Sequence, residues 1–139
     1  VATLGEAYVA DAGLSDRISY VRGDALVAEW PGGQDAVLMS YLLSGVPASE
    51  HDRLIARAFD HLAPGGRLLI HDFIVDEDRT GPKNAALWQL QHTAFTPEAR
   101  SVSDGWLTER MAQAGFAGVE VAPLIPGMTK LADGRRPAA

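Results

Sequence analysis

The chain has 139 residues, of which 47% are hydrophobic, and its formal net charge at pH 7 is -6. This length suits one domain, and the acidic balance offers no basic surface for a phosphate backbone, so nucleic acid is not an expected partner. The sequence contains no cysteine, which excludes disulfides, thiolate metal sites and cysteine nucleophiles.

The chain opens with a predicted helix and a predicted strand. Apolar residues recur on one helical face over residues 2–12, and Gly13 is expected to end this helix. Apolar and polar residues then alternate over residues 18–22, which predicts a short strand. Because the sequence starts at Val1 and enters a helix at once, it reads as a chain entered midway through a domain.

The middle of the chain predicts a parallel β-α-β unit. Residues 36–43 are a nearly unbroken apolar run, typical of a central strand covered by helices on both faces. Ser49, followed three residues later by Asp52, matches a capping box, and helical spacing continues over residues 49–62. A Pro-Gly-Gly break precedes a second apolar strand over residues 67–75, and the crossover makes the two strands parallel.

The last part of the chain predicts two helices and two strands. One helix is expected over residues 82–95, and Ser103 is expected to cap the next. The strands are expected over residues 118–122 and 128–132, with prolines between them. With no internal repeat and no linker, the sequence predicts one α/β domain over residues 1–139.

The apolar runs of this sequence are strand-sized. They fall short of the roughly 20 residues that a helix needs to cross a bilayer. The N-terminal residues show no charged start followed by an apolar core, so no signal peptide is predicted. No membrane segment is expected, and the absence of cysteine fits a reducing compartment, which together predict a cytoplasmic protein.

Four motifs narrow the α/β assignment. They are GDAL at residues 23–26, LMSYLLSGVP at 38–47, LAPGGRLLIHDF at 62–73 and AQAGF at 112–116. In order and spacing they resemble the class I S-adenosylmethionine-dependent O-methyltransferases, in particular the bacterial relatives of plant caffeate and acetylserotonin O-methyltransferases. The closing LIPGMTKLADGRRP is similar to the last strand pair of that family, so the resemblance extends over essentially the whole chain.

The resemblance implies a Rossmann-like α/β sheet of seven strands, which binds S-adenosylmethionine at the carboxyl ends of its strands. It also implies truncation at the N-terminus, because no Gly-x-Gly-x-Gly motif occurs and the first two strands of the family are absent. The predicted strand at residues 18–22 then lacks its neighbours. We therefore expect it to pair in another way, such as strand exchange with a second copy in a homodimer.

The resemblance assigns cofactor-binding roles to four residues. Asp24 matches the acidic residue that meets the adenine in the family, and the backbone amide of Ala25 would serve the same ring. The alternative for Asp24 is a turn that ends a strand. Ser40 stands where many relatives carry a lysine near the adenine, which weakens a side-chain role for it, and Tyr41 follows directly.

The chain departs from the family at the expected catalytic base. Relatives that methylate phenols read His-Asp-Trp where this chain reads Ser-Gly-Val, so Ser44 occupies the position of the general-base histidine. A general base contributes about 10²- to 10⁴-fold, whereas positioning two reactants is worth an effective molarity of roughly 10⁵ to 10⁸ M. The departure therefore predicts a changed substrate or mechanism rather than a loss of activity.

Asp72 is the stronger catalytic candidate, because the family carries an acidic residue here that helps to hold the base. The alternative is a cap on the following turn. His71 is adjacent, but successive strand residues point to opposite faces, so the two are not expected to form a dyad. A metal site of His71, Asp72 and His92 is a further alternative for a carbon-methylating or iron-dependent variant, although no metal is predicted.

Trp88 and His92 are four residues apart and share a helix face, in the segment that lines the acceptor pocket in relatives. Trp88 is therefore a candidate for substrate binding, and His92 is a candidate stand-in base. His71, on the preceding strand, is a further candidate for substrate binding. The alternative is that Trp88 is core and His92 a satisfied edge residue. Glu98 lies within a residue or two of the family's second acidic support residue, and is a further substrate-binding candidate.

Two other histidines, His51 and His61, fall on the helix after the first apolar strand, where packing or solvation is expected.

The sequence thus predicts methyl transfer from S-adenosylmethionine to an oxygen, or a carbon, of a small aromatic or polyketide-like acceptor in secondary metabolism. The alternative is a remnant or partner subunit that keeps the sheet and does not bind the cofactor. A nucleotide-dependent oxidoreductase has only fold analogy in its favour.

Overall fold

Four strands form one mixed sheet in the computed structural model, which describes residues 2–138 and leaves Val1 and Ala139 outside. The strands are β1 (Gln34–Ser40), β2 (Leu62–Asp72), β3 (Ala117–Ile125) and β4 (Thr129–Arg135). Their spatial order is β1-β2-β4-β3; β1 and β2 are parallel, and β4 is antiparallel to both of its neighbours. The predicted α/β class and the parallel β-α-β unit are confirmed.

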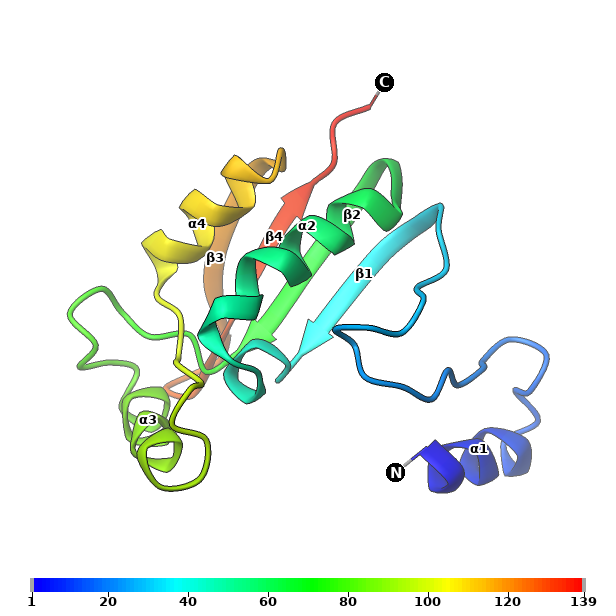
Figure 1. Cartoon of the computed structure of the whole chain (residues 1–139), viewed down its shortest axis with the longest axis horizontal. Helices are drawn as coiled ribbons and strands as arrows, with labels where there is room; N and C mark the ends of the chain where they lie inside the picture. Colours follow the sequence, from blue (N-terminus) through cyan, green and yellow to red (C-terminus); the bar gives the residue numbers. More distant parts are fainter. Residues whose placement is uncertain (1, 139) are drawn as a thin grey trace.

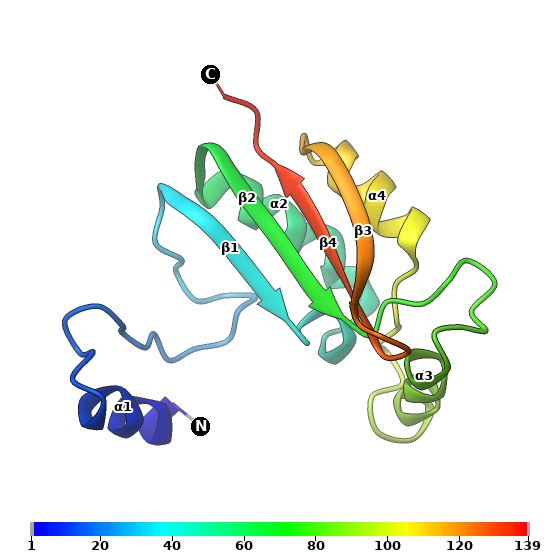
Figure 2. The same ribbon diagram turned by 180° about the vertical axis from the view of Figure 1, so that it is seen from behind.

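The helices of the described residues are α1 (Ala2–Asp11), α2 (His51–His61), α3 (Lys83–Phe95) and α4 (Asp104–Gln113). α2 and α4 cover one face of the sheet, and α3 lies beyond the end to which β1 and β2 point (Figures 1 and 2). The other face carries no helix of the described residues, and Leu38, which alternates with buried Met39, is 62% exposed there. The prediction that helices cover both faces of the strand at residues 36–43 is therefore wrong for the described part of the chain.

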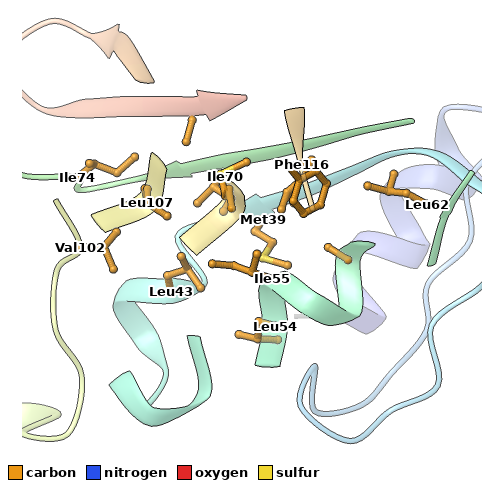
Figure 3. Close-up of a cluster of buried hydrophobic side chains, with 14 residues drawn as sticks. Met39, Leu43, Leu54, Ile55, Leu62, Ile70, Ile74, Val102, Leu107 and Phe116 are labelled. Carbon is orange, nitrogen blue, oxygen red and sulfur yellow. The ribbon is translucent and has the colours of Figure 1, made fainter. Parts of the chain in front are cut away.

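The hydrophobic core lies between the sheet and the pair α2 and α4 (Figure 3). Its largest buried side chains include Met39, Leu68 and Ile70 of the strands and Leu54, Ile55, Leu107 and Met111 of the helices. α2 forms because its apolar residues recur at helical spacing, and each leucine or isoleucine that it buries contributes about 1.5–3 kcal/mol. The rings of Phe59 and Phe116 meet edge to face at 5.1 Å beside this cluster.

Several predicted boundaries shift for local reasons. β1 ends at Ser40 because Tyr41 takes a left-handed backbone (φ 53°), and a 3-10 turn follows at Leu43–Gly45. β2 starts at Leu62, before the Pro-Gly-Gly segment, and ends at Asp72. Pro123 lies within β3, which is tolerated because β3 is an edge strand.

The two predicted N-terminal helix caps have different outcomes. Ser103 caps α4 as predicted, since its hydroxyl accepts the N–H of Trp106 at 3.4 Å. The capping box at Ser49 is wrong, because Ser49 lies within a 3-10 turn (Ala48–Glu50) and α2 begins after Glu50 with no side-chain cap.

The predicted strand at residues 18–22 is also wrong. These residues run as an irregular segment between α1 and β1, and Val21 is 71% exposed. α1 itself buries no residue, and Arg22 forms an ion pair with Glu6 of that helix. The segment stays irregular because none of the four described strands pairs with it.

Candidate functional site

A pocket of about 450 Å³ opens at the carboxyl ends of β1 and β2. It is lined by Tyr41, Ser44, Gly45, Phe73, Trp88, Gln91, His92, Phe95 and Thr96, and is here termed the aromatic pocket. The residues after the two strands supply one wall, and α3 with the residue that follows it supplies the other. The pocket therefore exists because α3 packs across the end of the sheet.

Four rings in contact run beside the aromatic pocket, from His71 on β2 to Trp88 on α3. Phe73 stacks on Trp88 with centroids 4.4 Å apart and planes 16° from parallel. Tyr41 lies between Phe73, at 5.2 Å, and His71, at 4.7 Å. Stacked and tilted rings at these distances form a rigid apolar wall, which fits a flat aromatic ligand.

Asp72 lies behind this wall and is 2% exposed. Its Oδ2 accepts the backbone N–H of Ser44 at 3.0 Å, and its Oδ1 accepts the N–H of Phe73 at 2.8 Å. The carboxylate thus fixes the backbone of two pocket residues instead of lining the pocket itself. This geometry matches the alternative of a local cap, and a catalytic role for Asp72 stays a prediction.

His71 points away from Asp72, as the strand alternation predicts. Its Nε2 is hydrogen-bonded with Thr129 Oγ1 at 2.9 Å, and its Nδ1 with Ser40 Oγ at 3.2 Å. These bonds hold the imidazole ring between β1 and β4. His71 and Asp72 form no dyad.

His92 is 7% exposed and combines burial with an unused ring nitrogen. Its Nδ1 is hydrogen-bonded with Thr96 Oγ1 at 3.0 Å, whereas its buried Nε2 has no partner among the described residues. Burial lowers the pKa of His92, although the charge of Asp72 opposes the shift. The ring is therefore neutral at pH 7, and with the proton on Nδ1 its Nε2 keeps a free lone pair.

Asp24 and Ala25 lie in the irregular segment before β1. Asp24 Oδ1 accepts the N–H of Leu26 at 2.9 Å, which forms the turn foreseen as the alternative. Within residues 2–138, neither Asp24 Oδ2 nor the N–H of Ala25 takes part in a hydrogen bond. Adenine presents an amino donor beside a ring acceptor, so this free acceptor and donor fit such an edge. Arg57 of α2 anchors the segment through the carbonyls of Leu26 and Ala28.

The predicted site residues fall into separate groups. Ser44, Trp88 and His92 line the aromatic pocket together with Tyr41, which was expected to meet the cofactor. Ser40, His71 and Asp72 lie on or beside the strands that support it, and no hydrogen bond of the described residues joins them to Asp24 or Ala25. Glu98 is exposed and does not line this pocket.

Sequence reasoning missed Gly45, Phe73, Gln91, Phe95 and Thr96 of the pocket. A signal for two of them was available, because Trp88, Gln91, His92 and Phe95 recur at the spacing of one helix face.

The other histidines pack as predicted. His51 is buried, its Nε2–H donates to the carbonyl of Leu43 at 2.9 Å, and burial lowers its pKa. His61 Nδ1 is hydrogen-bonded with the carbonyl of Arg57. In the described part of the chain no three His, Cys, Asp or Glu side chains form a group able to hold a metal, so His71, Asp72 and His92 do not assemble into one.

Among residues 2–138, no helix has the length and apolar character that crossing a bilayer requires.

Comparison with known proteins gives concordant matches. The family model of the O-methyltransferase domain matches residues 1–117. The chain is 34% identical over 117 residues to an L-tyrosine C(3)-methyltransferase of Streptomyces lavendulae, covering 83% of this chain and 32% of the relative. It is 32% identical over 119 residues to a 3-hydroxy-5-methyl-1-naphthoate 3-O-methyltransferase of Streptomyces sahachiroi, covering 86% and 34%.

A solved structure gives the same match. An O-methyltransferase family 2 protein from Planctomyces limnophilus, in complex with apigenin, is 29% identical to this chain with a TM-score of 0.79. The match covers 96% of this chain and 39% of that one. The chain spans about a third of the length of the curated relatives it matches.

Proposed function

Because the chain belongs to the O-methyltransferase domain family, we propose that it supplies the acceptor pocket of an enzyme that methylates an oxygen of a small aromatic molecule. The methyl donor in this proposal is S-adenosylmethionine, which supplies a methyl group already activated on a sulfonium. The aromatic pocket is the observation that carries the proposal, since parallel sheets bind ligands at the carboxyl ends of their strands.

The relatives support an aromatic acceptor. One is named for a hydroxynaphthoate and one for tyrosine, and a similar solved structure contains apigenin. The acceptor atom differs among them, because the tyrosine enzyme is named for a carbon. Carbon methylation is therefore the second candidate for this chain, favoured by Ser44 at the position of the usual base.

In the proposed complex, Asp24 Oδ2 and the N–H of Ala25 would hold the adenine of the donor. Tyr41 follows β1 and joins Phe73 in excluding water from one side of the pocket. Asp72 acts as a positioning residue, because it fixes the backbone on which this wall depends.

His92 takes the role of proton acceptor in this proposal. Its Nε2 is unpaired, and the lowered pKa keeps the ring neutral at pH 7. Ser44 has only a hydroxyl and is no base at this pH. With the donor bound, the acceptor oxygen would displace the sulfur from the methyl carbon, so that the carbon–sulfur bond breaks as the carbon–oxygen bond forms and S-adenosylhomocysteine leaves. The proton of the acceptor hydroxyl would pass to His92 Nε2 and then to solvent.

The proposal is tested by calorimetric titration with S-adenosylmethionine and by mass spectrometry of reactions that contain 2-naphthol. We expect saturable heat and 2-methoxynaphthalene, with Trp88→Ala forming less product because it removes the stacked ring. Neither heat nor product would favour the alternative of a partner subunit without transferase activity.

We also propose that the chain forms a homodimer. Val21 and Leu38 are among the exposed apolar side chains of the segment before β1 and of the helix-free sheet face. Exposed apolar side chains lose contact with water when a second copy covers them, which favours association. Analytical ultracentrifugation is expected to give twice the 14.8 kDa of one chain, and a concentration-independent mass of 14.8 kDa would contradict the dimer.

A further inference from the structure

A second cavity adjoins the aromatic pocket and shares His92 with it. Its volume is about 450 Å³, and its polar lining includes Arg79, Gln89, Arg100 and Ser101. A smaller cavity of about 270 Å³ shares Arg79, Arg100 and Ser101 with it. These two connected spaces are here termed the arginine cavity.

The arginine cavity carries positive charge without a negative partner. Arg79 donates to Gln89 Oε1 and to the carbonyl of Ser101, each at 3.1 Å. Within residues 2–138, neither Arg79 nor Arg100 forms an ion pair, unlike Arg53 and Arg67. A guanidinium has five N–H donors, so most of this donor capacity is unused.

Two buried polar atoms in the lining also lack partners. Ser101 is 3% exposed and its Oγ makes no hydrogen bond among the described residues, and the same holds for His92 Nε2. Buried polar atoms without partners are rare in native proteins, and each calls for a missing partner. An anion with acceptor oxygens would accept hydrogen bonds from both guanidinium groups, and Ser101 belongs to the same lining.

We infer that the arginine cavity binds a carboxylate of the methyl acceptor, which makes hydroxylated aromatic carboxylic acids the substrate class. This inference rests on the proposed function, because it places the ring of the same molecule in the aromatic pocket. The two cavities share His92 in their linings, and in this proposal one molecule places its ring in the aromatic pocket and its carboxylate in the arginine cavity. The planar guanidinium groups of Arg79 and Arg100 suit the two oxygens of a carboxylate.

In this arrangement the hydroxyl of the methyl acceptor lies near His92, which lines both cavities. The carboxylate of the same molecule lies near Arg79 and Arg100. The relatives named for a naphthoate and for tyrosine both act on aromatic acids, in agreement with this substrate class.

The inference is tested by titrating the protein with 3-hydroxy-2-naphthoate and with 2-naphthol, which lacks the carboxylate. We expect the naphthoate to bind about tenfold more tightly, with an advantage that shrinks at high salt. Arg79→Gln and Arg100→Gln should each remove most of this advantage and leave the affinity for 2-naphthol unchanged. Arg53→Gln, an equal loss of charge on α2 away from both cavities, should change neither affinity.

Arg100→Lys guards against a folding artefact, because it keeps the charge and should restore part of the naphthoate affinity. Equal affinities for the two probes, or an equal loss of both affinities in Arg79→Gln and Arg100→Gln, would overturn the inference. If 2-naphthol is methylated and the naphthoate has no advantage, the proposed function stands and the carboxylate site does not. If the naphthoate advantage depends on Arg100 and no methyl transfer occurs, the site stands and the proposed function does not.

Discussion

His92 lies where the aromatic pocket and the arginine cavity meet, with one ring nitrogen buried and unpaired. His92→Gln should reduce the rate of methyl transfer about 10²- to 10⁴-fold with little change in KM, because it removes the proton acceptor and keeps the size of the side chain. In the unaltered protein the rate should rise with pH through a pKa below the ordinary 6.5. Initial rates measured from pH 5 to 8 check both outcomes.

The matched control for this variant is His61→Gln, which lies outside both cavities and should keep the normal rate. A rate for His92→Gln within about threefold of the normal rate would assign proton transfer elsewhere.

Asp72 is a positioning residue, and its removal should appear first in stability. In Asp72→Asn, the amide group turns an N–H toward one of two backbone donors, so the free energy of unfolding should fall by about 1–3 kcal/mol. Urea denaturation measures this change. Asp60→Asn, at an exposed position of α2, should stay within about 0.5 kcal/mol of the unaltered protein. Full stability of Asp72→Asn with loss of activity would make Asp72 catalytic instead.

His51 makes stability depend on pH. Burial lowers its folded-state pKa below the ordinary value of 6.5, so the unfolded chain binds a proton first as the pH falls. The free energy of unfolding should therefore be pH-independent through this residue above about pH 7 and should decrease below 6.5. His51→Gln retains a donor for the carbonyl of Leu43 and does not titrate, so its stability should fall less between pH 7 and 5. Equal slopes in both proteins would contradict this assignment.

At the scale of elements, Lys130 of β4 ties three parts of the chain together. Its ammonium lies 2.6 Å from Asp76, in the loop after β2, and 2.7 Å from Asp104, in the first turn of α4. Although burial opposes the shift, hydrogen bonds to Asp104 and Asp76 raise the pKa of Lys130. The lysine side chain is 7% exposed, but both carboxylates are more open to solvent, which weakens each pair.

Lys130→Met should lower the free energy of unfolding by about 1–2 kcal/mol, because it leaves two carboxylates close together without their cation. Thermal unfolding and urea unfolding at low salt measure this decrease in the free energy of unfolding. Added salt should make the decrease smaller, because it screens the ion pairs. Lys83→Met, at an exposed position of α3, is the control and should change stability little. An equal decrease in the free energy of unfolding of Lys83→Met would show that the ion pairs of Lys130 with Asp76 and Asp104 contribute nothing specific.

The elements that the sequence predicted correctly carry their own local signals. The apolar residues of α2 recur at helical spacing, and Ser103 is an N-cap residue at the start of α4. The strand at residues 18–22 was wrong because alternation marks a strand only when a partner strand is available, and pairing is not local. The end of β1 was misplaced because a positive φ at Tyr41 leaves no trace in a hydrophobicity pattern.

At the scale of the whole molecule, the aromatic pocket is proposed to bind the ring of the acceptor and the arginine cavity its carboxylate. The motifs identified Ser44, which lines the aromatic pocket, and Asp72, which supports it, whereas helical spacing identified Trp88 of the pocket. The arginine cavity was not predicted, because Arg79 and Arg100 come from separate loops that meet only through packing around α3. Local spacing finds residues of one element, and only the fold shows which loops share a cavity.

The central claim is methyl transfer to a hydroxylated aromatic acid held by both cavities. The most direct measurement is mass spectrometry of the product after the protein is incubated with S-adenosylmethionine and 3-hydroxy-2-naphthoate. The account predicts 3-methoxy-2-naphthoate, formed faster than 2-methoxynaphthalene from an equal, subsaturating concentration of 2-naphthol. Unmodified 3-hydroxy-2-naphthoate and unconsumed S-adenosylmethionine would contradict it.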